Sequence, residues 1–258
     1  MLAQELIELH QAPRQVRPFS ERYPALTPNA GYAAARELHA HRLARGWKPV
    51  GRKIGFTNRT LWERYGVHEP MWGTVYDRTL IDAIDGHAAV GLAGLVQPRI
   101  EPEICFKLKA VPRTSDAEEL TRCIEWMAHS VEIVQCHHPD WKVTIADCTT
   151  DNGLHGRLVV GTPVPLGDPG KLPTVEAKLF KGERLVDRGV GANVLGSPLL
   201  SLGHLVDLLK VQPESPPLRA GEVITTGVLT DAHPVAAGEQ WHTEIAGLPL
   251  HGLRISFE

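Results

Sequence analysis

The sequence predicts an α+β protein in which a helical N-terminal part packs on a body rich in strands. Helix-forming patterns dominate the first part of the 258 residues, whereas from about residue 71 short β-branched and aromatic segments follow one another, each bounded by Gly or Pro. Helices and strands do not alternate regularly, which disfavours a doubly wound parallel sheet. No internal repeat or low-complexity linker divides the chain.

The most strongly patterned helix covers residues 30–44. Thr27 and Pro28 supply an N-cap and a first helical residue, and the segment that follows is rich in Ala, Leu and Arg. Gly46 stands where a residue just beyond a helix belongs. These signals agree with one another and predict both ends of the helix.

A strand and a second, shorter helix are expected next. Residues 50–56 alternate like a strand, and Gly51 and Gly55 within it permit the close approach of another group. The helix is predicted over residues 58–65, with Asn58 as its cap.

The rest of the chain reads as strands interrupted by two helices. One helix begins at the capping-box pattern of residues 115–118 and is predicted to run to about Met127; the other covers residues 198–209. Residues 181–183 look like a hairpin turn. The predicted strands cover residues 72–76, 100–108, 130–135, 158–160, 175–180, 223–226, 241–245 and 253–257.

Composition excludes several classes of protein. The chain is 43% hydrophobic, and 27 basic against 30 acidic residues give a net charge of −3 without long runs of one sign. Nucleic acid and anionic membranes are therefore disfavoured as partners. The N-terminus lacks the apolar run of a signal peptide, and no stretch approaches the roughly 20 apolar residues of a membrane span. Four widely spaced cysteines without a C-x-x-C pair indicate reduced thiols and a cytoplasmic protein.

Three acidic residues lie on apolar strands. Glu101 and Glu103 are two apart on a predicted strand, so their side chains share one face, and Glu132 lies in a similar apolar setting. Carboxylates gathered in this way suit a hard cation such as Mg²⁺ or Mn²⁺. The alternative is a solvated sheet face, which Pro102 supports because proline is typical of strand edges. Spacing alone leaves both readings open.

Other candidate functional residues have weaker support in the sequence. Residues 136–138, Cys-His-His, could bind zinc, but no second cluster completes a tetrahedral site. Lys53, flanked by Gly-Arg and Ile-Gly, could project into a site or be a solvated strand lysine. Asp147, Asp151 and Asn152 lie in a polar stretch that suits a capped loop. The chain has no complete dinucleotide or P-loop pattern and no G-x-S-x-G motif.

The sequence resembles the 2-keto-4-pentenoate hydratase and 4-oxalocrotonate decarboxylase group of the fumarylacetoacetate hydrolase superfamily. The motifs that carry the resemblance are short, but their order and spacing span nearly the whole chain. They are Gly-Arg-Lys-Ile-Gly at 51–55, Gly-Val-His-Glu-Pro at 66–70, Gln-Pro-Arg-Ile-Glu-Pro-Glu-Ile at 97–104, Val-Glu-Ile-Val at 131–134, Asp-Trp at 140–141, Asp-Asn at 151–152, Leu-Gly at 195–196 and Leu-Arg-Ala-Gly-Glu at 218–222.

The resemblance implies a fold and a metal site. The expected fold is a mixed β-sandwich roll, with a smaller helical N-terminal region over residues 1–75 and a catalytic core over residues 76–258. The acids that hold Mg²⁺ or Mn²⁺ in this family correspond to Glu101, Glu103 and Glu132.

The resemblance also implies an activity. The expected reaction adds water to a 2-hydroxyalka-2,4-dienoate, a product of aromatic meta-cleavage, and gives a 4-hydroxy-2-oxo acid. The bound cation would act as a Lewis acid, and Lys53 would supply positive charge and transfer a proton. Asp77 is the nearest match to a further acid of the family's site and would position or activate water.

Substrate contacts are expected from Trp72, Asn152, Ser197 and Thr226. Trp72 stands where the family usually has Tyr or Phe, and Ser197 stands where it usually has His. Phe56, Leu154 and His155 depart from its pattern as well, so a larger or more apolar substrate tail is compatible with the sequence.

Three alternatives accompany this reading. The same metal site would serve decarboxylation of a 4-oxalocrotonate-type enedioate. A non-catalytic member would act as the structural partner of a pathway enzyme, although the retained acids and Lys53 argue against it. Relatives that cleave C–C bonds or decarboxylate oxaloacetate usually carry a Glu-His pair in a short helix, which is not found here. A homo-oligomer is expected, as is common in the superfamily.

Overall fold

The computed structural model describes residues 1–212 and 214–258, and of Tyr65 only the backbone. The helices are α1 (Leu2–Gln11), α2 (Phe19–Arg22), α3 (Pro28–Ala44), α4 (Trp62–Tyr65), α5 (Ala117–Cys123), α6 (Ile145–Thr150) and α7 (Pro198–Lys210). The strands are β1 (Pro49–Gly55), β2 (Met71–Tyr76), β3 (Leu80–Asp82), β4 (His87–Val90), β5 (Arg99–Leu108), β6 (Ile124–Val134), β7 (His155–Val160), β8 (Glu176–Lys181), β9 (Arg184–Val190), β10 (Val223–Thr225), β11 (His233–Pro234), β12 (Gln240–Ala246) and β13 (Arg254–Phe257).

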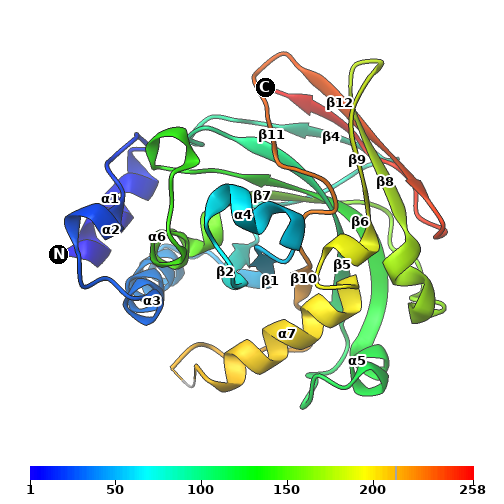
Figure 1. Ribbon diagram of the computed structural model, residues 1–258, viewed down its shortest axis with the longest axis horizontal. Helices are drawn as coiled ribbons and strands as arrows, with labels where there is room; N and C mark the ends of the chain where they lie inside the picture. Colours follow the sequence, from blue (N-terminus) through cyan, green and yellow to red (C-terminus); the bar gives the residue numbers. More distant parts are fainter. Residues whose placement is uncertain (213) are drawn as a thin grey trace.

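The strands form two mixed sheets (Figure 1). The larger has eight strands, seven of them in the order β2-β1-β10-β5-β6-β7-β3, with β11 paired to β5 beside this path. The smaller has five strands in the order β4-β13-β12-β8-β9. Helices α1, α2, α3 and α6 gather at one end, near the N-terminus, and the small sheet lies on the other side of the molecule (Figure 1). The predicted α+β class and sandwich of mixed sheets are confirmed.

The two sheets pack through apolar side chains. Ile100, Ile133 and Val159 of the large sheet belong to one buried cluster with Leu179 and Ile255 of the small sheet. Because side chains alternate along a strand, the residues between these apolar positions point to the opposite face of the large sheet. That opposite face of β5 and β6 is where the candidate site lies.

Helix α3 follows the sequence signals. Its cap is Thr27, whose hydroxyl accepts a hydrogen bond from the N–H of Ala30 at 3.2 Å, and Pro28 is its first residue. Gly46, just beyond its end, has a left-handed φ of 79°. Leu38 packs with Leu6 and Phe19, so α1, α2 and α3 form a small apolar cluster of their own.

Helix α5 is shorter than predicted. It is capped by Asp116, whose carboxylate accepts from the N–H of Glu118, and it ends at Cys123. The expectation that it continues to Met127 is wrong, because Ile124 already begins β6 and Met127 pairs with Phe106 of β5. Pairing with the sheet and burial of both side chains outweigh the local preference for helix.

Strand β10 lies between β1 and β5 in the large sheet. It pairs in parallel with β1, where Gly51 faces Val223. A Cβ added at Gly51 would lie 2.1 Å from the carbonyl oxygen of Val223, so the close approach expected at this glycine is confirmed.

The predicted boundary after residue 75 does not separate helices from strands. Strands β1 and β2, between Pro49 and Tyr76, are integral to the large sheet, and the purely helical segment ends at Ala44. The division into residues 1–75 and 76–258 as units stays a prediction.

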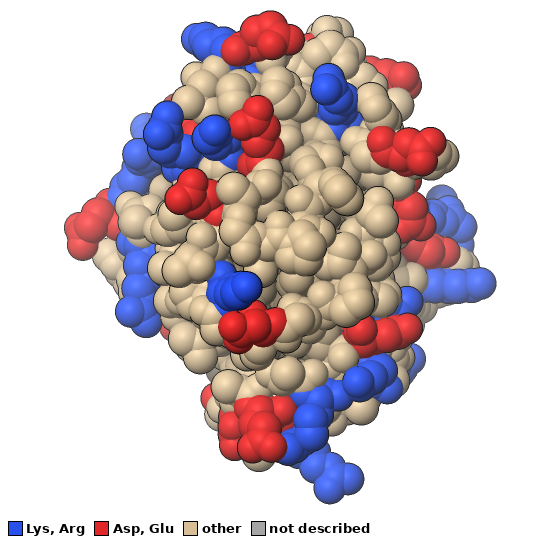
Figure 2. Space-filling view, turned by 90° about the vertical axis from the view of Figure 1, so that its right-hand side faces the viewer, with Lys and Arg blue, Asp and Glu red and all other residues tan. Residues whose placement is uncertain are grey.

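Surface charge is mixed on the side of the small sheet. Figure 2 shows Lys and Arg interspersed with Asp and Glu, mostly around the edge of this face, with uncharged residues over its middle. Within residues 1–212 and 214–258, no helix combines the length and the apolar character that a membrane span requires.

Candidate active site

Three glutamates from neighbouring strands meet on one face of the large sheet. Glu101 and Glu103 lie on β5, and Glu132 lies directly opposite Glu101 on the antiparallel strand β6. Directly opposed residues and residues two apart on a strand share a face. One carboxylate oxygen from each lies within 4.8 Å of the others. The structure therefore brings together the three acids that the sequence predicts as metal ligands.

Hydrogen bonds hold two of these carboxylates by one oxygen only. Oε2 of Glu103 accepts from the hydroxyl of Thr225 and from the N–H of Gly227, the latter at 2.9 Å. Oε1 of Glu132 lies 2.8 Å from Nδ1 of His155. Of the other two oxygens, Oε1 of Glu103 is buried without a hydrogen-bond partner, and Oε2 of Glu132 is buried with Nζ of Lys53 at 3.3 Å. Because buried carboxylate oxygens need a compensating partner, this arrangement fits a cation.

Lys53 places a positive charge beside the acids. Its side chain, which is 3% exposed, comes from β1; Nζ donates to the carbonyl of Gly153 at 2.9 Å and lies 3.3 Å from Oε2 of Glu132. Burial alone would lower the pKa of Lys53, but Glu132, Glu101 and Glu103 together raise it. Lys53 is therefore an ammonium group in the metal-free protein.

One ammonium group does not neutralise three carboxylates. Burial raises the pKa of Glu101 to about 7, against the opposing effect of Lys53. Burial and the two neighbouring glutamates raise the pKa of Glu103 well above its ordinary value. Burial acts on Glu132 in the same direction, but Lys53 and His155 outweigh it and lower the pKa of Glu132. The excess negative charge and the all-oxygen donor set match what Mg²⁺ and Mn²⁺ prefer.

A pocket with about 490 Å³ of empty space opens beside the acids. Lys53 and Glu101 contribute to its lining and are the only charged residues that do so in the described part of the chain. Its remaining wall is mostly apolar. The larger apolar residues of that wall are Phe56, Leu61, Met71, Val134, Trp141, Leu154 and Val228. A ligand anchored at the acids would therefore extend along hydrocarbon and aromatic surface.

Two of the residues predicted to bind substrate make contacts within the protein. The indole ring of Trp72 stacks on Tyr32 at 5.4 Å, and its Nε1 donates to Gln212 at 2.9 Å. The side-chain amide of Asn152 bonds both the N–H and the carbonyl of Thr74, at 2.9 and 3.0 Å. Neither is among the described residues that line the pocket.

The other two predicted substrate-binding residues are also held by the protein. Ser197 caps α7, where its hydroxyl accepts from the N–H of Leu199 at 3.3 Å. The hydroxyl of Thr226 donates to the carbonyl of Ile104 at 2.7 Å. A role in substrate binding stays a prediction for all four residues.

Asp77 lies away from the acids. It is exposed just beyond the end of β2, and its Oδ1 accepts from the N–H of Lys48 at 2.9 Å. Lys53 pairs with Gly73 across the two strands. Asp77 is four residues further on, which is about 13 Å along a strand. The structure does not bring Asp77 to the pocket that Lys53 lines.

Three residues around the acids escaped the sequence analysis as functional groups. Thr225 and Gly227 are two positions apart, at and just after the end of β10, and they contact Glu103 only because β10 inserts beside β5. His155 reaches Glu132 across a register shift between Ile133 and Val134. Neither the insertion nor the shift has a signal in local sequence patterns.

Known proteins resemble this chain over nearly its whole length. No model of a known protein family matches it. It is 33% identical over 251 residues to 2-hydroxyhexa-2,4-dienoate hydratase from Comamonas testosteroni, a match that covers 95% of this chain and 92% of that protein. It is also 33% identical over 226 residues to 4-oxalocrotonate decarboxylase from a Pseudomonas species, covering 87% and 85% of the two chains.

Solved structures share the fold. The structure of 4-oxalocrotonate decarboxylase from Pseudomonas putida G7, complexed with magnesium and adipate, superposes with a TM-score of 0.90 at 26% identity and covers 100% of this chain and 96% of that one. A fumarylacetoacetate hydrolase family protein from yeast shares the fold alone, with a TM-score of 0.57 at 13% identity over 80% of this chain and 91% of that one.

Proposed function

Because the chain belongs to the 2-keto-4-pentenoate hydratase and 4-oxalocrotonate decarboxylase group of the fumarylacetoacetate hydrolase superfamily, we propose that it is a divalent-metal-dependent hydratase. Its substrate would be a 2-hydroxyalka-2,4-dienoate formed in aromatic meta-cleavage catabolism, and its product a 4-hydroxy-2-oxo acid. The observation that carries this proposal is the group of three glutamates, two buried and one partly buried, with Lys53 beside it and an apolar pocket next to both.

Glu101, Glu103 and Glu132 would hold Mg²⁺ or Mn²⁺. The buried Oε1 of Glu103 supports this assignment, since nothing in the described part of the chain hydrogen bonds to it, and Oε2 of Glu132 has only Lys53 beside it, at 3.3 Å. A bound divalent ion supplies Lewis acidity for the carboxylate and C2 oxygen of a 2-oxo or 2-hydroxy acid. The hydrogen bonds from Thr225, Gly227 and His155 keep the carboxylates oriented when the site is loaded.

Lys53 would hold and transfer the proton that converts dienol to enone. Its Nζ is fixed between the carbonyl of Gly153 and a carboxylate oxygen, so the ammonium is oriented before substrate binds. The C2 hydroxyl gives up its proton as a substrate carbon takes one, and Lys53 can mediate that transfer at Nζ. Water then adds to C4 of the enone. Asp77 has no part in this account because it lies outside the pocket.

The pocket favours a hydratase over a decarboxylase. A 2-hydroxydienoate carries one carboxylate, which the metal end of the site accommodates, and ends in hydrocarbon. A 4-oxalocrotonate-type substrate carries a second carboxylate that needs a cation or several N–H donors at the far end. Apart from Lys53 and Glu101, the described lining residues carry no charge. Asn58 is the amide side chain among them, and its Nδ2 already donates to the carbonyls of Val228 and Thr230.

Decarboxylation is the second candidate function. It is supported by the TM-score of 0.90 to a 4-oxalocrotonate decarboxylase and by the 33% identity to another. A purely structural partner of a pathway enzyme is disfavoured, because two buried carboxylates, a partly buried third and a buried lysine are costly to retain without a ligand.

One assay separates these candidates. Purified protein is mixed with enzymatically generated 2-hydroxypenta-2,4-dienoate, and the decay of its ultraviolet absorbance is followed with Mg²⁺ and then with EDTA. Metal-dependent decay to 4-hydroxy-2-oxopentanoate, identified by mass, is the expected result. Absence of decay combined with CO₂ release from the dicarboxylic analogue would establish the decarboxylase, and inactivity on both would reject the catalytic proposal for these substrates.

We also propose that the protein is a cytoplasmic homo-oligomer that associates with another enzyme of its pathway. Four free, buried cysteines support a reducing compartment. Strand β9 is an edge of the small sheet with Leu185 and Val190 38% and 37% exposed, which supports contact with a second copy there. Light scattering on a size-exclusion column tests the oligomer, and the mass of a single chain would contradict it.

A further inference from the structure

The turn that holds Lys53 is strained. Asn152, Gly153 and Leu154 form the short 3-10 segment before β7, and all three have positive φ, at 49°, 66° and 61°. Left-handed backbone costs a non-glycine residue roughly 1–2 kcal/mol, so such a turn persists only where its surroundings hold it. The carbonyl of Gly153 accepts the hydrogen bond from Nζ of Lys53. The conformation of this turn therefore determines where the ammonium group lies.

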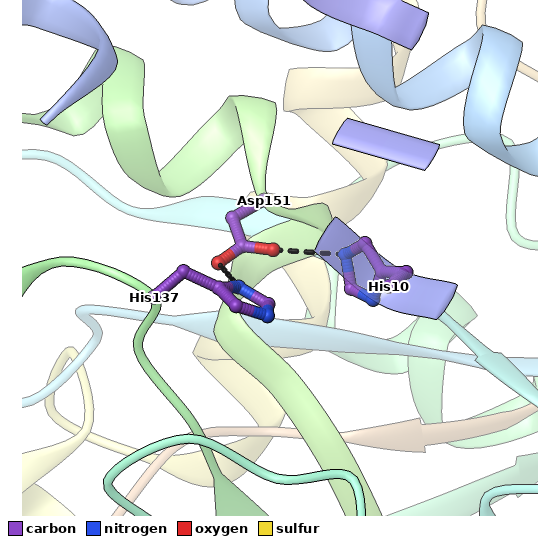
Figure 3. Close-up of side chains that lie close together, drawn as sticks. All are labelled: His10, His137 and Asp151. Carbon is purple, nitrogen blue, oxygen red and sulfur yellow. Dashed lines mark hydrogen bonds and ion pairs between the residues drawn. The ribbon is translucent and has the colours of Figure 1, made fainter. Parts of the chain in front are cut away.

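The residue before the turn is held by two histidines. Asp151 is fully buried; its Oδ1 lies 2.9 Å from Nε2 of His10 on α1, and its Oδ2 lies 2.7 Å from Nδ1 of His137, in the loop after β6 (Figure 3). We call these three residues the His-Asp-His clamp. It joins Asp151 to His137, 14 positions away, and to His10, 141 positions away.

The direction of each hydrogen bond follows from its neighbours. Nη2 of Arg42 lies 3.1 Å from Nδ1 of His10, and because arginine only donates, that Nδ1 accepts. Nε2 of His10 then carries the proton and donates to Asp151. His137 donates from Nδ1, since a carboxylate only accepts. Burial raises the pKa of Asp151, but His137 and His10 outweigh it and hold the carboxyl ionised.

The clamp is close enough to hold a metal, but its geometry favours hydrogen bonds. The ligand atoms of His10, His137 and Asp151 lie within 4.8 Å of one another. Ligands bound at about 2.0–2.1 Å around one tetrahedral ion are more than about 3 Å apart, whereas here the nitrogen and oxygen atoms meet at 2.7 and 2.9 Å. The guanidinium of Arg42 beside His10 also disfavours a cation.

We propose that His10, Asp151 and His137 are positioning residues for Lys53. The clamp fixes the start of the strained turn, the side chain of Asn152 ties the turn to Thr74 of β2, and the carbonyl of Gly153 is thereby presented to Nζ of Lys53. Helix α1 is then part of the support of the active site although it contributes nothing to the pocket lining that the structure describes. The inference rests on the proposed role of Lys53.

Paired amide substitutions test the clamp. The amide nitrogen of Asn can replace Nδ1 of a histidine, and that of Gln can replace Nε2. His137 donates from Nδ1, so His137→Asn should keep kcat within about threefold of the parent, whereas His137→Gln should lower it about tenfold or more at unchanged KM and Mg²⁺ affinity. His10 donates from Nε2, so the order should reverse, with His10→Gln active and His10→Asn impaired. A side chain that only fills space would not reverse its preference in this way.

A second measurement does not depend on turnover. Reductive methylation of Nζ, quantified at Lys53 by peptide mass spectrometry, should be faster in His137→Gln than in His137→Asn and the parent. This readout separates failure of the clamp from failure of the proposed hydratase activity. Thermal unfolding of each variant shows that it is folded.

Three outcomes would overturn the proposal. Folded variants with equal kcat and equal labelling of Lys53 would show that the clamp does not position it. Equal losses from Asn and Gln at both positions would assign the histidines to packing alone. A second divalent ion bound per parent chain, lost in His137→Asn, would make the cluster a metal site.

Discussion

Removing one charge from the glutamate group should stabilise the metal-free protein at alkaline pH. Burial raises the pKa of Glu101 from 4.5 to about 7, so the folded chain binds this proton more tightly than the unfolded chain does. Stability is therefore lost as pH rises through that interval. At about 1.4 kcal/mol per pH unit, the loss reaches about 3 kcal/mol by pH 8. Glutamine cannot ionise, so Glu101→Gln should recover about that amount at pH 8 and nearly nothing at pH 4.5.

Mg²⁺ should make the parent more stable than the Glu101→Gln variant at pH 8, the reverse of the order in EDTA. At a free Mg²⁺ concentration of 100 times Kd, binding stabilises the folded parent by about 2.7 kcal/mol, whereas a variant that has lost a ligand charge gains much less. The measurement is urea unfolding followed by tryptophan fluorescence at pH 4.5 and pH 8, in EDTA and in Mg²⁺. Glu125→Gln, at an exposed position of the same strand as Glu132, is the control. It should change the free energy of unfolding neither in EDTA nor in Mg²⁺.

The reasoning would be refuted by a Glu101→Gln protein that is less stable than the parent at pH 8 in EDTA. It would also fail if Mg²⁺ stabilised the variant as much as the parent, since Glu101 would then not contribute to the metal site.

Three further substitutions probe the active-site lysine, the apolar pocket wall and a buried ion pair elsewhere in the protein. Lys53→Met should leave Mg²⁺ binding measurable by calorimetry but lower kcat about 100-fold or more, and unchanged turnover would contradict a role for the ammonium. Leu61→Arg places a cation on the apolar wall of the pocket. We expect kcat/KM for a dicarboxylic dienol to rise about tenfold or more relative to kcat/KM for a hydrocarbon-tailed dienoate. An unchanged ratio of the two values would show that this wall does not contact the substrate tail. Glu222→Ala leaves the buried guanidinium of Arg52, now 3.3 Å from that carboxylate, without its charge partner and should cost about 3–5 kcal/mol in urea unfolding, with a loss below about 1 kcal/mol counting against the pair.

The parts of the site that the sequence predicts are those determined by local geometry. Glu101 and Glu103 share a face because residues two apart on any strand do, and this holds whatever the rest of the chain does. The cap and stop signals of α3 are likewise within a few residues of the helix they bound. The local pattern also made Glu132 and Lys53 candidates, and the family resemblance then gave them their roles, but their position beside these acids depends on pairing between strands.

The parts that the sequence did not predict depend on how distant segments meet. Lys53 lies on β1 and Asp77 lies just after the neighbouring strand β2, and only the pairing of Lys53 with Gly73 shows that Asp77 lies beyond the site. His10 and Asp151 are 141 positions apart, and no periodicity in either segment indicates their contact. The prediction that a helix extends to Met127 was wrong for the same reason, because residues 124–127 pair with the distant strand β5.

The central position of β10 has a consequence for how the protein folds. The β5–β6 hairpin and the β1–β2 pair can each form from contiguous chain, but β10 must enter between β1 and β5 before the two halves share one sheet. During synthesis, the edges of β1 and β5 that pair with β10 therefore remain without this partner until residues 223–225 have left the ribosome. Pairing across such long sequence separations slows folding. The two carboxylates of β5, the one of β6 and the ammonium of Lys53 become a single site only in that late step, so a nascent chain that has not yet closed its sheet cannot assemble the complete site.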